Sequence, residues 1–180
     1  MVLYVGLTYN IPFEKITGDP ANYYNAHPFT GIISNIGALL WCTSAALSFF
    51  TGLILLKLKK NAFFFISSGI FTFLLLVDDF FMFHDYLFYK INNLETQYFF
   101  YIVYAILFAY YLYKNYKIIL NTRYLILLIG IFFFGLSILL DSFLPSEGLQ
   151  YFIEDGCKFL GLISWTIYHS FTCYDYLLKE

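Results

Sequence analysis

The sequence predicts an all-α integral membrane protein, built as a bundle of five transmembrane helices. Of its 180 residues, 61% are hydrophobic and only 12% are charged, whereas soluble chains have about 45–50% apolar and about 25% charged residues. A soluble domain of this size leaves much of its surface in water and could not hide so much apolar surface. The same figures exclude a disordered, collagen-like or coiled-coil chain.

Five apolar segments are each long enough to cross a bilayer, which takes about 20 largely apolar residues. They are continuous rather than alternating, which favours helices over the strands of a barrel. The first segment, from Thr30 to about Leu56, contains no Asp, Glu, Lys or Arg. The second, from Ala62 to about Phe83, is uncharged up to Asp78. The third covers Gln97 to about Tyr113, the fourth Tyr124 to about Leu140, and the fifth about Tyr151 to Leu177.

The lysines and arginines predict the orientation of these spans. One side of the membrane receives Lys57, Lys59, Lys60, Lys114, Lys117, Arg123 and Lys179, and the other receives Lys15, Lys90 and Lys158. Because basic residues favour the cytoplasmic side, we expect the N-terminus outside and the C-terminus in the cytoplasm. Residues 1–29 are then an extracytoplasmic tail and residues 30–180 the transmembrane domain. The expected location is a cell membrane crossed several times, the bacterial inner membrane.

Acidic residues gather at the outer ends of the predicted spans. The six that reach this level are Asp78, Asp79, Asp85, Asp141, Glu154 and Asp155. Lys158 alone cannot pair with all of them, so some must be solvated, share protons or be neutralised by a cation. Two interpretations stay open: an ion-pair network that ties the helices together, and a functional site.

A divalent metal would neutralise this cluster, and Zn, Mn, Fe or Ca would suit its residue types. The expected ligands are Asp78, His84, Asp85 and Glu154. The leading hypothesis is a metal-assisted hydrolase that acts on a lipid or another amphiphile. In it Asp79 or Asp155 serves as general base, and Lys158 holds an anionic group. His169, about four turns beyond Glu154, is expected to be a packing histidine that is hydrogen-bonded in the bundle.

Two other functions fit the same pattern. Acids inside a span can relay protons or bind cations, which is typical of a proton- or cation-handling protein. However, the cytoplasmic halves of predicted spans two to four carry few polar groups, so no path across the membrane is visible there. The other function is that of a small structural subunit in a larger membrane complex. Expected partners are membrane lipids and membrane proteins, and not nucleic acid, because no basic patch with interleaved aromatic residues occurs.

Two resemblances accompany these patterns. Four segments together resemble a pattern in bacterial polytopic membrane proteins without a known activity, and this resemblance extends over most of the chain. The segments are Gly31–Gly37, Leu40–Cys42, Asp78–Asp85 and Glu154–Gly161.

A fainter similarity is to the alkaline ceramidase and adiponectin-receptor superfamily, whose members hold zinc in a helix bundle with a Ser, an Asp and histidines. The matching residue types are Ser34, Asn35, Asp78 or Asp79, and His84. That superfamily has seven spans and a C-terminal histidine pair, whereas this chain is predicted to have five spans and has only His169 in that region. The similarity is therefore one of chemistry.

Overall fold

The computed structural model of this chain describes residues 8–9, 12–18, 24–27, 29–82, 94–143 and 148–178. In these ranges every regular element is an α-helix, and none is a strand. The elements are the short α2 (Phe13–Thr17) and the long helices α4 (Ile32–Lys57), α5 (Phe63–Phe81), α7 (Leu94–Leu120), α8 (Tyr124–Phe143) and α9 (Leu149–Leu178). The prediction of an all-helical chain is thus confirmed for the described residues.

The chain divides into two compact units, Met1–Ile32 and Ile33–Glu180. The first unit contains α2, a helix of 5 residues. The second contains the long helices, whose lengths range from 19 to 30 residues. Residues 58–62 connect α4 to α5, and residues 121–123 connect α7 to α8.

Three of the long helices are long and apolar enough to cross a membrane: Ile32–Lys57, Phe63–Phe81 and Tyr124–Asp141. They coincide with the first, second and fourth predicted spans, and they indicate that the chain associates with a membrane. The third and fifth predicted spans form the long helices α7 and α9. These two helices carry more charged residues than each of the other three.

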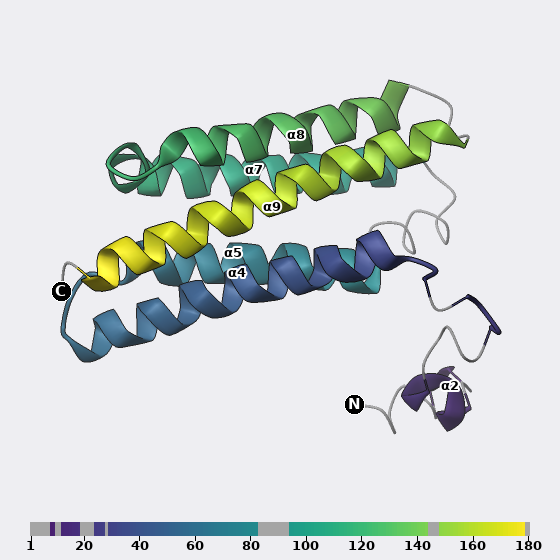
Figure 1. Cartoon of the computed structure of the whole chain (residues 1–180), viewed down its shortest axis with the longest axis horizontal. Helices are drawn as coiled ribbons and strands as arrows, with labels where there is room; N and C mark the ends of the chain where they lie inside the picture. Colours follow the sequence, from purple (N-terminus) through teal and green to yellow (C-terminus); the bar gives the residue numbers. More distant parts are fainter. Residues whose placement is uncertain are drawn as a thin grey trace. The chain divides into compact units, whose positions relative to one another are not determined.

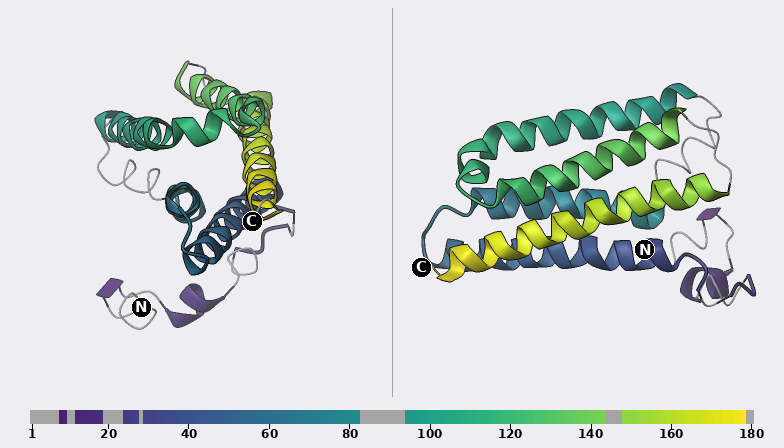
Figure 2. Two further views of the ribbon diagram at one scale, coloured as in Figure 1. Left: turned by 90° about the vertical axis from the view of Figure 1, so that its left-hand side faces the viewer. Right: turned by 45° about the horizontal axis from the view of Figure 1, so that its top comes forward.

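The long helices lie side by side, with α9 between α8 and the pair α4 and α5 (Figures 1 and 2). Hydroxyl groups link the neighbours: Ser44 of α4 to Thr166 of α9, and Ser68 of α5 to Tyr111 of α7, each at 2.9 Å between oxygens. The start of α4, the end of α5 and the start of α9 lie at one end, and the α7–α8 turn lies at the other (Figure 1). This antiparallel order brings residues far apart in sequence to the same level.

The core is centred on α9, because one face of this helix is buried along most of its length. Trp165 on that face is only 1% exposed. Rings from each of the four other long helices surround its indole at centroid distances of 6.0–6.5 Å. They belong to Trp41 of α4, Phe71 of α5, Phe108 and Tyr111 of α7, and Phe134 of α8. One side chain therefore contacts the whole set of long helices.

Helices α8 and α9 approach each other closely through glycines. A Cβ atom placed on Gly161 of α9 would lie 2.9 Å from the ring of Phe134, and one on Gly130 of α8 would lie 3.3 Å from the Gly161 carbonyl oxygen. Small residues at such crossings let helix backbones pack tightly, as they do between helices in membranes. The lack of a side chain at these two positions thus sets the spacing of α8 and α9.

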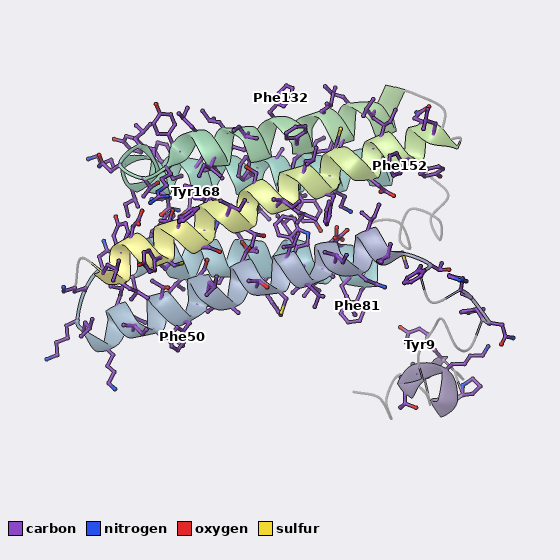
Figure 3. All side chains as sticks on the ribbon, in the orientation of Figure 1. Tyr9, Phe50, Phe81, Phe132, Phe152 and Tyr168 are labelled. Carbon is purple, nitrogen blue, oxygen red and sulfur yellow. The ribbon has the colours of Figure 1, made fainter. Side chains whose placement is uncertain are left out.

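Large aromatic side chains also cover the outside of the long helices. Phe50, Phe81, Phe132 and Phe152 project away from their neighbours, whereas Tyr168 is enclosed between helices (Figure 3). A helix that faces water carries polar residues on its outer side. Extended apolar outer faces instead suit contact with lipid, in agreement with the membrane association of the three apolar helices.

Candidate functional site

A small pocket opens between α4, α5 and α9, at the end where α5 finishes and α9 begins. Its polar walls are Ser34, Asp79, Asp155 and Lys158, and its apolar walls include Ile33 and Leu162. The volume is about 50 Å³, which holds a few water molecules or one small hydrated ion. Helical spacing brings Asp155, Lys158 and Leu162 to one face of α9, because they follow at intervals of three and four residues.

The main polar contact in this pocket is an ion pair between Lys158 of α9 and Asp79 of α5. The Asp79 side chain is 15% exposed and that of Lys158 is 41% exposed, so the pair is largely but not fully removed from solvent. Asp79 lies two residues before the end of α5, where the helix dipole disfavours a negative charge. The ammonium group of Lys158 offsets that repulsion and connects α5 to α9.

The charges on the pocket walls do not cancel. Two carboxylates, from Asp79 and Asp155, face one ammonium group, from Lys158, which leaves an excess of one negative charge. Ser34 adds a hydroxyl oxygen to the same wall. An acidic site with oxygen donors attracts cations, and hard cations such as Ca²⁺ and Mn²⁺ prefer these ligands.

The three predicted catalytic residues, Asp79, Asp155 and Lys158, thus come together on one pocket, although their chemical roles stay predictions. The predicted metal ligands are not brought to this pocket in the part of the chain that the structure describes. Asp78 is 8% exposed and lies against Tyr104 of α7, whose hydroxyl is positioned to donate to its carboxylate. It therefore points away from Asp79, as expected for neighbouring residues on a helix.

The other predicted ligands do not extend the pocket. Glu154 is half-buried on α9 and does not line it, and His84 and Asp85 lie outside the described residues. Among the described residues, no three His, Cys, Asp or Glu side chains are placed to share a metal ion. The ligand set of Asp78, His84, Asp85 and Glu154, and with it the metal-assisted hydrolysis, stays a prediction.

The opposite end of α9 carries a second ion pair. Arg123, the last residue of the α7–α8 turn, approaches Asp175 at 3.3 Å, and its guanidinium carbon lies 4.2 Å from the centroid of the Phe171 ring. Both charged side chains are more exposed than Asp79. This pair is a useful reference for the pocket, because it joins the same types of charge at the other end of α9.

Sequence reasoning missed a seam of buried polar residues between α4 and α9. We call this set the α4–α9 seam: Ser44, Ser48 and Thr51 of α4, and Thr166 and Cys173 of α9. Its signal was present in α4, where small hydroxyl residues recur at intervals of three and four between apolar residues. Such residues are nearly neutral in a hydropathy scan and were therefore overlooked.

His169 of α9 is the packing histidine that the sequence predicted. It is 1% exposed, its ring stacks on Trp165 at a centroid distance of 4.6 Å, and its Nδ1 lies 3.1 Å from the Trp165 carbonyl oxygen. The Trp165 indole in turn donates to the Thr72 hydroxyl of α5 at 3.1 Å. The histidine is therefore held in a fixed orientation at the centre of the bundle.

Comparison with known proteins identifies one family, whose function is not described. No curated protein and no solved structure gives a significant match to this chain. The resemblances to bacterial polytopic membrane proteins and to the ceramidase superfamily stay predictions. One family model, described as "Domain of unknown function (DUF8692)", matches residues 1–172. Because this match covers nearly the whole chain, the chain belongs to the DUF8692 family.

Proposed function

We propose that this chain is a membrane protein of five spans that binds a small, hard cation in the pocket of Asp79, Asp155 and Lys158. In this proposal α7 and α9 are spans as well as α4, α5 and α8. The N-terminus lies outside and the C-terminus in the cytoplasm of a cell, most simply a bacterium. The proposal favours cation handling over the hydrolysis of an amphiphile, and the next paragraphs give its support.

The length and packing of α7 and α9 support five spans. With 27 and 30 residues, they extend over roughly 40–45 Å at 1.5 Å per residue, more than the hydrocarbon core of about 30 Å. Each packs lengthwise against an apolar helix, α7 against α5 and α9 against α8. A helix in that position shares the environment of its neighbour. The charged residues of α9 lie near its two ends, and its middle carries none.

The basic residues support the orientation. Lys57, Lys59 and Lys60 lie at the α4–α5 connection, and Lys117 and Arg123 lie around the α7–α8 turn. Both connections are at the end of the bundle opposite the pocket (Figure 1). Basic residues favour the cytoplasmic side. The pocket is therefore on the outer side in this proposal.

The observation that carries the cation proposal is the excess of carboxylate over ammonium on the walls of one pocket. Its volume of about 50 Å³ suits an ion with one or two water molecules. Oxygen atoms from Asp79, Asp155 and Ser34 suit hard cations, so Mn²⁺ or Ca²⁺ fits better than Zn²⁺.

Mn²⁺ binding to the full chain in lipid nanodiscs, followed by electron paramagnetic resonance, tests this proposal. We expect Asp155→Asn to weaken Mn²⁺ binding at least tenfold, because it removes the carboxylate that Lys158 does not pair. Asp175→Asn is the matched control, since it removes an acid that pairs with Arg123 at the other end. Equal Mn²⁺ affinity in the wild type and both variants would show that the ion binds elsewhere, and would overturn the proposal.

A further inference from the structure

The outer face of α7 is apolar along most of its length and basic at its end. The inner face of α7 packs against α5, where Tyr111 and Asn115 are buried and reach the hydroxyls of Ser68 and Ser67. On the opposite side of the helix, exposed residues follow at intervals of three and four, which places them in one row. We call this row the α7 stripe: Ile102, Ile106, Tyr110, Tyr113 and Lys117.

The α7 stripe has the same order of chemistry as a phospholipid. Ile102 and Ile106 are 58% and 62% exposed and offer an apolar surface to an acyl chain. Tyr110 and Tyr113 follow, and tyrosines gather at the level of lipid headgroups. From Ile102 to Tyr113 the helix rises by roughly 16 Å, close to one leaflet of a hydrocarbon core of about 30 Å. In a membrane-spanning α7, Lys117 therefore lies at the level of the phosphates.

Two lysines at the end of the α7 stripe lie against aromatic rings. The Lys114 ammonium group is 5.7 Å from the centroid of the Tyr110 ring, and that of Lys117 is 5.9 Å from the centroid of the Tyr116 ring. These distances are typical of cation–π contacts. Both lysines are exposed, and within the described ranges neither forms an ion pair with an acid. Their positive charges are therefore held beside the helix and accessible to an anion.

The sequence around these lysines contains no acid to balance them. Residues 96–140 include no Asp or Glu, although Lys114, Lys117 and Arg123 all lie among them. Arg123 is paired with Asp175 of α9. Two excess positive charges therefore remain at the end of the bundle that contains the α7–α8 turn (Figure 1), and both are on α7.

We infer that the end of the α7 stripe binds an anionic phospholipid, with its phosphate at Lys114 and Lys117 and an acyl chain along Ile106 and Ile102. The two lysines are three residues apart and so can reach the same phosphate, and basic groups at the cytoplasmic ends of spans attract anionic headgroups. A soluble phosphate would leave the apolar part of the stripe uncovered, which favours a lipid as the occupant. This inference rests on the proposed five spans, because α7 must face lipid.

Lys57 and Lys59 at the α4–α5 connection provide the matched control. They lie at the same end of the bundle as the α7 lysines (Figure 1) and contribute the same charge. In the described part of the chain, however, neither has an aromatic ring beneath its ammonium group. A general attraction of basic residues to an anionic leaflet would involve both pairs of lysines equally, whereas a lipid site on α7 depends on one pair.

Native mass spectrometry of the full chain in detergent, titrated with phosphatidylglycerol or phosphatidylcholine, tests the lipid site. We expect the first phosphatidylglycerol to bind at least fivefold more tightly than phosphatidylcholine. This preference should fall at least threefold in Lys114→Gln with Lys117→Gln, persist when both are changed to Arg, and persist in Lys57→Gln with Lys59→Gln. Glycerol phosphate, which has the anionic group without acyl chains, should not displace the lipid.

The absence of a preference in the wild type, or equal losses in the two Gln double variants, would overturn the lipid site. Displacement by glycerol phosphate would also contradict a lipid as the occupant. Labelling of Ile106→Cys by a membrane-impermeant maleimide in liposomes, with Cys42→Ser to remove the exposed thiol, separates this inference from the five spans. A protected Ile106→Cys without a lipid preference contradicts the lipid site alone, whereas a labelled one contradicts the five spans and with them the lipid site.

Discussion

Lys158 of α9 pairs with Asp79 of α5 across 79 positions of sequence, at the end of the bundle where a second acid, Asp155, faces the same pocket. The pair has a structural role, because it joins two helices, and it also sets the charge of the pocket. These two roles predict different outcomes for substitutions of its two members.

Asp79→Asn should lower the free energy of unfolding by about 1–3 kcal/mol, less than for a fully buried pair because Lys158 keeps contact with solvent. Asp175→Asn, at the exposed pair with Arg123, should cost less than about 1 kcal/mol. Unfolding of both variants in the same detergent, followed by circular dichroism, compares them. Equal losses of stability in the two variants would show that the burial of Asp79 adds nothing to the free energy of unfolding.

Lys158→Met should tighten Mn²⁺ binding, because the pocket then carries two excess negative charges rather than one. Removal of a unit positive charge within about 8 Å of a divalent ion is worth at least about 2 kcal/mol at an effective dielectric constant near 40, so we expect a gain of at least tenfold in affinity. Arg123→Met is the control at the other end of α9. Weaker Mn²⁺ binding in Lys158→Met would contradict this electrostatic account and would show instead that the ion pair with Asp79 holds the pocket in shape.

Two glycine substitutions test the close approach of α8 and α9. A Cβ on Gly161 would meet Phe134 at 2.9 Å, whereas one on Gly135 of α8 meets nothing within 4 Å. We expect Gly161→Ala to cost about 1–3 kcal/mol through overpacking, and Gly135→Ala to add up to about 1 kcal/mol of stability. Thermal unfolding measures both. A stabilised Gly161→Ala would contradict the packing of these two helices.

The all-helical class and most helix positions were predictable, because long continuous apolar segments indicate helices. The end of α7 was predicted least well: the apolar segment ends near Tyr113, whereas the helix continues to Leu120. Lysines do not break a helix, and the Lys114 ammonium group lies over the face of the Tyr110 ring, 5.7 Å from its centroid. Hydropathy therefore identifies the apolar part of a helix and underestimates the length of the whole helix.

The pocket was predictable in part. Helical rise alone placed Asp79, Asp155 and Lys158 at one level, and the structure brings them to one wall. Which side each acid faces depends on helix rotation, and so the turn of Asp78 toward Tyr104 was not visible in the sequence. The partner of Lys158 was likewise undetermined, because several acids lay within reach of it by depth alone.

The number of Mn²⁺ ions bound per chain tests the central claim most directly. Equilibrium binding to the full chain in nanodiscs should give one tight Mn²⁺ site in the wild type and in Asp175→Asn, and none in the double variant Asp79→Asn with Asp155→Asn. One tight site retained in the double variant, or none in the wild type, would contradict a cation site at this pocket.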